Sequence, residues 1–257
     1  MKNLEPICLG APAEDELPST FTLSTWNVWF DRHKREERNL ALLAELERHR
    51  PHVMLFQEVT PPFIRAIQAT EWLREGYWLS GVEHNEIGVV MMARVRCHGL
   101  VFHPLTSQMG RRLLVGEFAD QVKVAGAHFE SNRGSGETRA VQFSEALDIL
   151  ERAPAAVLAG DFNSSAADPE SETLNNRTRD AWSAVHSDQP GFTIDSERNE
   201  MLRKQSPQNR VQSRIDRLLC LGSTQALDIR LLGTEPFSGQ DFPSDHFGIL
   251  ARLSRQI

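Results

Sequence analysis

Apolar and polar residues alternate in blocks along this chain, and the spacing within each block predicts either a strand or a helix. Short runs rich in β-branched and aromatic residues, such as "TFTLSTWNVWF", are typical of strands. Apolar residues that recur every three or four positions, as in "NLALLAELE", are typical of helices. We expect strands over residues 20–30, 53–59, 87–95, 113–118, 122–130, 155–163, 213–222, 226–233 and 246–253. We expect helices over residues 34–50, 61–76 and 135–153, with Ser135 as the N-cap of the last, and a short helix within 179–187.

The strands and helices fall into two comparable halves, residues 20–130 and 130–257, with no linker, low-complexity block or clear repeat between them. This pattern predicts one layered α/β domain over residues 19–257, in which two sheets pack together and helices lie outside. Residues 1–18 are acidic and contain several prolines, and we expect them to form a flexible leader.

Composition and charge limit the classes of function. No apolar run approaches the roughly 18 residues that cross a bilayer, so we expect no membrane partner. The net charge of −7 argues against a protein that coats nucleic acid through diffuse positive potential. It is compatible with an enzyme that holds phosphates through a metal ion and a few arginines.

The cysteines (Cys8, Cys97 and Cys220) are too scattered for a disulfide framework. This favours reduced thiols in a cytoplasmic protein, or a nuclear one in a eukaryote.

Several predicted strands end in polar residues, where loops expose side chains above a rigid scaffold. These residues are Asn27, Glu58, His128, Asp161 and His246. Each also has a purely structural interpretation: Glu58 can be a surface residue, and His128 a buried histidine without chemistry. In "GDFN", Asp161 and Asn163 can close an Asx-turn.

Asp216 lies inside an otherwise apolar strand, "SRIDRLLCL". A buried carboxylate without a partner is costly, so we expect a positive or hydrogen-bonding partner. Histidine is a natural candidate, because a carboxylate fixes its tautomer and raises its pKa. His246, in "FPSDHFGIL", either has this role or only occupies the start of a buried strand.

Taken together, these side chains suit attack by water on a phosphoester. Glu58 and Asn27 offer oxygen ligands to a hard cation such as Mg²⁺, for which Mn²⁺ is a possible substitute. Asp161 can orient and deprotonate a water, while Asn163 and His246 can bind the phosphoryl oxygens. The sequence has no G-x-S-x-G motif and no G-x-x-x-x-G-K-[ST] loop, which argues against a serine nucleophile and against NTP hydrolysis.

Six short motifs, "TWN", "QE", "HFES", "GDFN", "RID" and "SDH", occur in this order and resemble the endonuclease/exonuclease/phosphatase superfamily. Longer segments such as "QMGRRLL" and "HFESNRGSGETRAVQ" are most similar to the 5′-tyrosyl-DNA phosphodiesterases, which remove a topoisomerase tyrosine from a DNA 5′-phosphate. The resemblance implies a four-layered α/β sandwich of the deoxyribonuclease I type, with two mixed sheets, and Mg²⁺-dependent phosphoester hydrolysis.

The resemblance also assigns residues to three groups. The metal ligands are Glu58, Asn27 and Asp245. The catalytic residues are Asp161, Asn163, His246, Asp216 and His128. The substrate-binding residues are Ser131, Arg133 and Arg111. Three positions depart from the pattern of this group, and they concern the substrate more than the hydrolytic residues; they are Trp29, Ser165 and Ile194.

We therefore expect a monomeric phosphodiesterase that acts on a nucleic-acid end, single-stranded or at the end of a duplex, and removes a 5′-phosphotyrosyl adduct from DNA. An RNA-directed enzyme, either a deadenylase-like 3′-exonuclease or a 2′,5′-oligoadenylate hydrolase, fits the same residues. A phosphatase for a small metabolite and an inactive binding module on the same fold also stay open. The basic residues of the 200–214 loop, Arg203, Lys204, Arg210 and Arg214, suit a polymer or an inositol phosphate almost equally, and a loop that is only solvated is the alternative.

Overall fold

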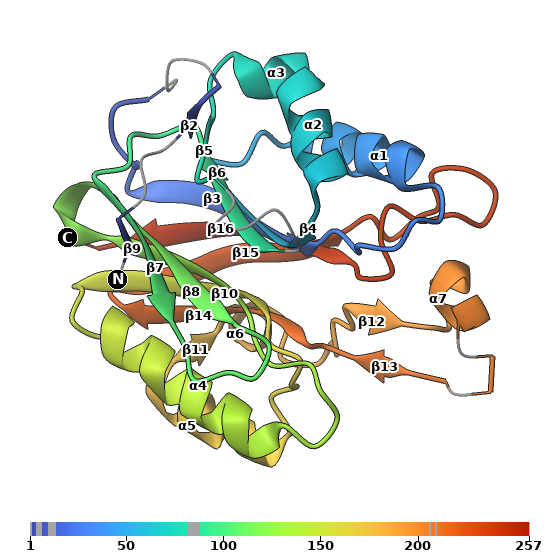
Figure 1. The fold of residues 1–257 in the computed structure, drawn as a ribbon. Coiled ribbons are helices and arrows are strands. Elements are labelled where there is room, and N and C mark those ends of the chain that lie inside the picture. The colour runs from blue at the N-terminus through green and yellow to red at the C-terminus, as the bar shows by residue number, and fades with distance from the viewer. Residues whose placement is uncertain are drawn as a thin grey trace.

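Two β-sheets pack face to face, and helices cover their outer faces (Figure 1). The computed structural model describes residues 2–3, 7–9, 14–81, 88–205, 207–208 and 210–256, and within them each sheet has seven strands. The first sheet has the order β1 (Lys2–Asn3), β7 (Gly99–Pro104), β8 (Arg112–Glu117), β9 (Lys123–His128), β10 (Ala155–Asp161), β14 (Asp216–Gly222) and β11 (Arg179–Asp180). The second has the order β15 (Thr224–Leu232), β16 (Gly248–Arg255), β3 (Thr20–Asn27), β4 (Val53–Val59), β6 (Gly88–Ala93), β5 (Trp78–Leu79) and β2 (Ile7–Cys8).

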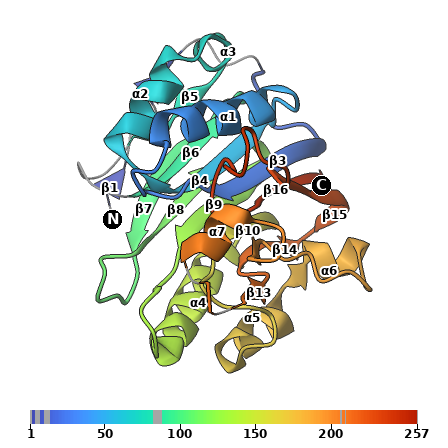
Figure 2. The same ribbon diagram turned by 90° about the vertical axis from the view of Figure 1, so that its right-hand side faces the viewer.

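The helices form the two outer layers (Figures 1 and 2). Over the second sheet lie α1 (Arg35–Glu47), α2 (Pro61–Ala69) and α3 (Glu71–Arg74). Over the first sheet lie α4 (Gly136–Leu150) and α5 (Glu172–Arg177), with the 3₁₀ turn η2 (Pro169–Ser171) between them. The remaining elements are η1 (Ala119–Gln121), α6 (Ala181–Val185), and the pair β12 (Ile194–Asp195) and β13 (Gln212–Ser213), with α7 (Glu200–Gln205) between its strands. Among the described residues, no helix has both the length and the apolar character needed to cross a bilayer.

The alternation of side chains along a strand explains why the strands are apolar throughout. In β4, Val53 and Leu55 point into the core between the sheets, whereas Met54 and Phe56 point into the core beneath α1 and α2. A strand covered on both faces needs apolar residues at every position. Both sheets contain parallel and antiparallel pairs, as the parallel pairs β3–β4 and β9–β10 show. The predicted four-layered α/β sandwich with two mixed sheets is confirmed.

Several predicted element boundaries were wrong for local reasons. The strand expected over 20–30 ends at Asn27, since Asn27 Oδ1 accepts a hydrogen bond from Trp29 N and Trp29 has a positive φ of 58°. The helix expected over 61–76 is interrupted at Thr70, whose backbone is extended and whose Oγ1 donates to Ala66 O at 2.7 Å. Ser135 occupies the N-cap position of α4, but its side chain makes no capping hydrogen bond.

The leader predicted over residues 1–18 lies partly outside the described residues. Its described parts pair with the sheets, because β1 adds to β7 and β2 adds to β5. Leu17 is buried, and its carbonyl accepts a 2.7 Å hydrogen bond from Arg255 Nη2. These parts therefore belong to the fold and are not free.

The cysteines that the structure describes are free thiols. Burial raises the pKa of Cys97 to about 11 and that of Cys220 to about 12, so both stay protonated at neutral pH. The side chain of Cys8 lies outside the described residues.

Candidate active site

Three polar residues form a row across neighbouring strands of the first sheet. Asp161 at the end of β10 is in register with His128 on the parallel strand β9 and with Asp216 on the antiparallel strand β14. Gly160 permits this arrangement: its φ is 144°, and a Cβ there would lie 2.0 Å from Ala127 O on β9. Only glycine lets β9 and β10 approach so closely beside Asp161.

The second sheet contributes Asn27 at the end of β3 and Glu58 near the end of β4. Asn27 Nδ2 donates to Asp161 Oδ2 at 3.0 Å, so a hydrogen bond joins the two sheets at the site. Glu58 has a positive φ of 58° and lies where the register between β4 and β6 shifts, which redirects its side chain. Its Oε2 accepts a 3.0 Å hydrogen bond from Phe30 N.

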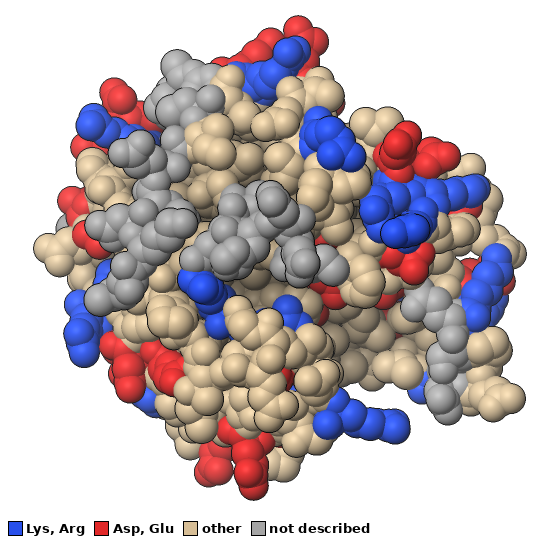
Figure 3. All heavy atoms as spheres, in the orientation of Figure 1, with Lys and Arg blue, Asp and Glu red and all other residues tan. Residues whose placement is uncertain are grey.

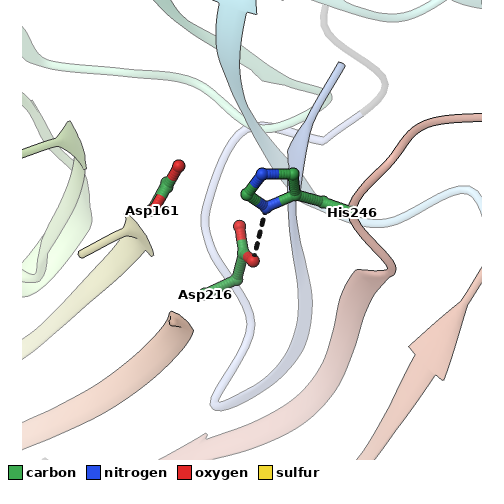
Figure 4. A group of neighbouring side chains, drawn as sticks. All are labelled: Asp161, Asp216 and His246. Carbon is green, nitrogen blue, oxygen red and sulfur yellow. Dashed lines mark hydrogen bonds and ion pairs between the residues drawn. The ribbon is translucent and has the colours of Figure 1, made fainter. Parts of the chain in front are cut away.

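His246 lies just before β16 and pairs with Asp216. The distance from His246 Nδ1 to Asp216 Oδ2 is 2.8 Å, and Figure 4 shows the ring against Asp216, with Asp161 on the neighbouring strand. Burial opposes a charged imidazole, but the carboxylates of Asp216, Asp245 and Asp161 outweigh it and hold the pKa of His246 well above its ordinary value. Asp216 is fully buried and has the histidine partner that its position in the sequence predicted.

Asp245 and Glu58 form a second acidic group. Burial and, to a smaller extent, the nearby Glu58 carboxylate raise the pKa of Asp245 to about 6, against the opposing effects of His246 and Arg38. Two neighbouring carboxylates repel each other when both are charged, and a cation bound between them offsets this repulsion. With the oxygen of Asn27, this donor set fits a hard divalent ion such as Mg²⁺.

A second group of possible metal ligands consists of Asp161, Asp216 and His246, whose ligand atoms all lie within 4.8 Å of one another. In this group His246 Nδ1 is already paired with Asp216 Oδ2. Asp216 Oδ1 is buried and has no hydrogen-bond partner among the described residues. We favour the group around Glu58 for a hard cation, because all its donors are oxygens.

His128 is held between Arg111 and Asp161. Arg111 Nη1 lies 3.1 Å from His128 Nδ1, and Arg111 Nη2 lies 3.4 Å from His128 Nε2. A guanidinium can only donate, and the shorter contact favours Nδ1 as the acceptor, with the ring proton on Nε2. Nε2 lies 3.4 Å from Asp161 Oδ2. Burial lowers the pKa of His128 to about 4, and Arg111 lowers it too, whereas Asp161 opposes the change. His128 is thus a neutral residue whose N–H faces Asp161.

These groups adjoin a cavity of about 560 Å³, which we call the catalytic pocket. Its lining residues are Phe30, Glu58, Pro61, Met109, Arg111, His128 and Ser131. Arg111 Nη2 donates to Ser131 Oγ at 3.1 Å, which fixes the predicted substrate-binding pair at one wall. Phe30 and Met109 are about half exposed and form an apolar rim.

Two predicted site residues, Asn163 and Arg133, do not line the catalytic pocket. Asn163 follows β10 with a positive φ of 49°; its N donates to Asp161 Oδ1, and its Nδ2 donates to Phe129 O. The second N–H of that amide stays available to a ligand. Arg133 is exposed, does not line the catalytic pocket and makes no hydrogen bond or ion pair with the described residues.

Arg38, a fully buried arginine on α1, was not predicted from the sequence as a site residue. Its guanidinium donates to five backbone carbonyls of the two loops beside Glu58 and Asp245; these belong to Val28, Trp29, Asp31, His33 and Pro243. In the sequence Arg38 belongs to the charged run "KREER", which is typical of a solvated helix face, so no local signal distinguished it.

Two further residues that the sequence did not indicate hold the site loops. Asn199 Nδ2 donates to Ser244 O and Asp245 O, at 2.9 and 3.4 Å. Glu130 is fully buried, and its Oε2 accepts a 2.6 Å hydrogen bond from Ser107 Oγ. Ser107 Oγ in turn accepts from Arg111 N, so Glu130 supports the backbone of Arg111, the residue before β8.

The basic residues of the 200–214 loop, for which a ligand was one interpretation, are mostly paired within the protein. Arg214 binds both oxygens of Asp180, Arg203 binds Glu200, and Lys204 Nζ donates to Gln240. Arg210 is exposed.

Comparisons with known proteins agree with this architecture. A sequence profile of the Endonuclease/Exonuclease/phosphatase family matches residues 24–246. Tyrosyl-DNA phosphodiesterase 2 from Bos taurus is 27% identical over 260 residues, covering 93% of this chain and 69% of that protein. The Homo sapiens protein of the same name is 27% identical over 263 residues, covering 95% and 71%. The structure of D. rerio TDP2 complexed with single-strand DNA product superposes with a TM-score of 0.83 at 21% identity, covering 92% of this chain and 100% of that one, which establishes the fold.

Proposed function

Since this chain belongs to the endonuclease/exonuclease/phosphatase family, we propose that it is a metal-dependent phosphodiesterase that releases a tyrosyl group from the 5′ end of DNA. The observation that carries the proposal is the row of His128, Asp161 and Asp216, with His246 paired to it and the Glu58–Asp245 group beside it. The bovine and human relatives are named tyrosyl-DNA phosphodiesterase 2, which supports the choice of ester.

Asp161 is the acceptor for a proton of the attacking water. Hydrogen bonds from Asn27 Nδ2 and Asn163 N fix its carboxylate, and the N–H of His128 faces the same oxygen as Asn27. The water oxygen forms a bond to phosphorus as the bond from phosphorus to the tyrosyl oxygen breaks. A free tyrosine hydroxyl has a pKa of about 10, so the leaving oxygen departs more readily than an aliphatic alkoxide.

His246 stabilises the charge that develops on the phosphoryl oxygens. Asp216 holds the ring through Nδ1 and favours the charged form, which leaves Nε2–H to donate. The free N–H of Asn163 is a second donor. Glu58 and Asp245, with Asn27, would hold Mg²⁺ or Mn²⁺, which supplies positive charge against the phosphate when bound.

A gel assay tests this function. Protein with Mg²⁺, and with EDTA as control, is given a 5′-phosphotyrosyl DNA oligonucleotide, the same oligonucleotide with an abasic site, and poly(A) RNA. We expect 5′-phosphate DNA from the first substrate alone, and Asp161→Asn should slow its release by about 10² to 10⁴-fold. Shortened poly(A) with intact phosphotyrosyl DNA would instead identify an RNA-directed enzyme.

A further inference from the structure

A second pocket, of about 330 Å³, lies beside the catalytic pocket. It is lined by Arg32, Lys34, Arg35, Glu36, Glu37, Pro62 and Arg65, and we call it the arginine pocket. The two pockets adjoin at consecutive residues, since Pro61 lines the first and Pro62 the second. Arg35 connects them as well, because its Nη2 donates to the carbonyl of Phe30, whose N–H binds Glu58.

The cations of the arginine pocket are only partly neutralised by the protein. Lys34 Nζ is paired with Asp241 Oδ2 at 2.6 Å. Arg35 is held by two backbone carbonyls, those of Phe30 and Asp31, which fix its guanidinium without neutralising it. Arg32 and Arg65 are exposed, and within the described residues neither makes a hydrogen bond or an ion pair through its side chain.

Two carboxylates, Glu36 and Glu37, line the same pocket, and Asp241 neutralises Lys34, so three arginines face two anions there. Figure 3 shows this mixture on the right of the view, where Lys and Arg gather over the start of α1 with Asp and Glu beside them. The chain carries a net charge of −7, so a polyanion is attracted only where positive charge is concentrated locally. A pocket with free arginines beside a phosphoester site is such a place.

We propose that the arginine pocket binds one backbone phosphate of the nucleic-acid substrate, beyond the phosphate that is hydrolysed. Arg32 and Arg65 supply the charge, and the anchored Arg35 supplies a fixed donor. The inference rests on the proposed function only in requiring a polymer substrate. A substrate with a single phosphate cannot reach both pockets and gains nothing from the arginine pocket.

The first test measures binding without turnover. Asp161→Asn protein in EDTA is titrated with a fluorescent 5′-phosphorylated single-stranded DNA oligonucleotide at several salt concentrations. In the same background, Arg32→Ala with Arg65→Ala should make the slope of log K against log[salt] shallower by about 0.7, the value for one phosphate contact to a single strand. The matched control is Arg74→Ala with Arg152→Ala, two exposed arginines whose side chains have no partner among the described residues.

The second test compares long and short substrates with otherwise native protein. The Arg32→Ala, Arg65→Ala variant should raise KM for a 5′-phosphotyrosyl oligonucleotide about tenfold. It should leave the turnover of thymidine 5′-phosphate p-nitrophenyl ester, which has one phosphate, unchanged. Glu36→Gln with Glu37→Gln should lower the KM of the oligonucleotide, because it removes the opposing charge.

The outcomes distinguish phosphate binding in the arginine pocket from the proposed release of tyrosine. An unchanged slope and KM in the arginine variant, an equal change in the control variant, or no DNA binding at all would overturn the inference. Should the wild-type protein fail to release tyrosine from DNA, the proposed function is wrong, yet the salt slope still reports whether the pocket binds a nucleic-acid phosphate.

Discussion

His128 shows how a buried histidine takes part in a site without carrying charge. The shorter of its two contacts with Arg111 favours Nδ1 as the acceptor, which places the N–H on Nε2, toward Asp161. A charged histidine in the same place would face the Arg111 guanidinium. The sequence left open whether His128 is a buried structural residue or belongs to a site. The structure shows that it is buried and also lies beside Asp161.

The depressed pKa of His128 makes stability depend on pH. A histidine in the unfolded chain titrates near 6.5, so between pH 6.5 and about 4 the unfolded state binds a proton that the folded state refuses. The contribution of His128 is complete above pH 6.5 and falls as the pH is lowered through that range, by about 3 kcal/mol in all. Urea unfolding at pH values from 7.5 to 4.5 measures the free energy of unfolding. As the pH falls, this free energy should decrease more for the wild type than for His128→Gln. A difference between the two proteins that stays constant with pH would contradict it.

Where the signal in the sequence was local, it indicated residues that the structure brings together at the candidate site. A polar residue directly after an apolar strand marked Glu58 and Asp161, and a carboxylate inside an apolar strand predicted the partner that Asp216 has in His246. Arg38 could not be found in this way, because its partners are backbone carbonyls that any residue offers. One of them, that of Pro243, is 205 positions away in the sequence.

Helix α1 organises two loops of the site through that one side chain. Arg38 fastens the loop after β3, where Phe30 N binds Glu58, and the loop before β16, which carries Asp245. A helix that looks peripheral therefore fixes the position of both acidic residues.

Arg38→Met should lower the free energy of unfolding by about 3 to 5 kcal/mol, because buried carbonyls lose their donors. It should also weaken Mg²⁺ binding, because the loops that place Glu58 and Asp245 are released. Chemical denaturation and calorimetric titration with Mg²⁺ measure the two effects. Arg48→Met, at an exposed arginine that follows the same helix, is the control. Equal Mg²⁺ affinity in both variants would limit Arg38 to stability alone.

The β9–β10 pair depends on one glycine. Gly160→Ala should lower the free energy of unfolding by more than about 3 kcal/mol. The alanine Cβ would lie 2.0 Å from Ala127 O, so the strands would have to separate. Separation moves His128 from Asp161, so kcat should fall in the protein that remains folded. Gly239→Ala, also at a positive φ but with nothing within 4 Å of its Cβ, should cost only about 1 to 2 kcal/mol. Similar losses in the two variants would show that backbone strain, and not the close approach of β9, sets the cost.

Long and fully buried elements were easier to predict from the sequence than short or partly exposed ones. The long strands covered on both faces were recognisable as apolar runs. Among the strands that were not predicted, β5 has only two residues, and β7 has six that include Gly99, His103 and Pro104. The break between α2 and α3 depends on a side-chain hydrogen bond of Thr70, which helical spacing does not reveal.

The two sheets meet at the site, so a bound ion should stabilise the packing of the whole sandwich. Asn27 from the second sheet is bonded to Asp161 from the first, and Glu58 and Asp245 lie beside this junction. At ten times its Kd, Mg²⁺ should add about 1.4 kcal/mol, which raises Tm by about 3 to 6 °C in a chain of this size. Thermal unfolding with Mg²⁺ and with EDTA measures the shift. Glu58→Gln should abolish most of it, and Glu75→Gln, at an exposed residue after α3, should not; a full shift in the Glu58 variant would remove Glu58 from the ligand set.

The register that aligns His128, Asp161 and Asp216 has a consequence for how such a protein can diverge. A single inserted or deleted residue within β9, β10 or β14 would turn a member of this row to the opposite face and also disturb two buried layers. The catalytic pocket rim and the arginine pocket, in contrast, are formed largely by loops and helix ends, which tolerate changes of length and composition. Descendants of this sequence can therefore exchange one phosphoester substrate for another by altering these surfaces, while the chemistry is inherited unchanged with the sheet.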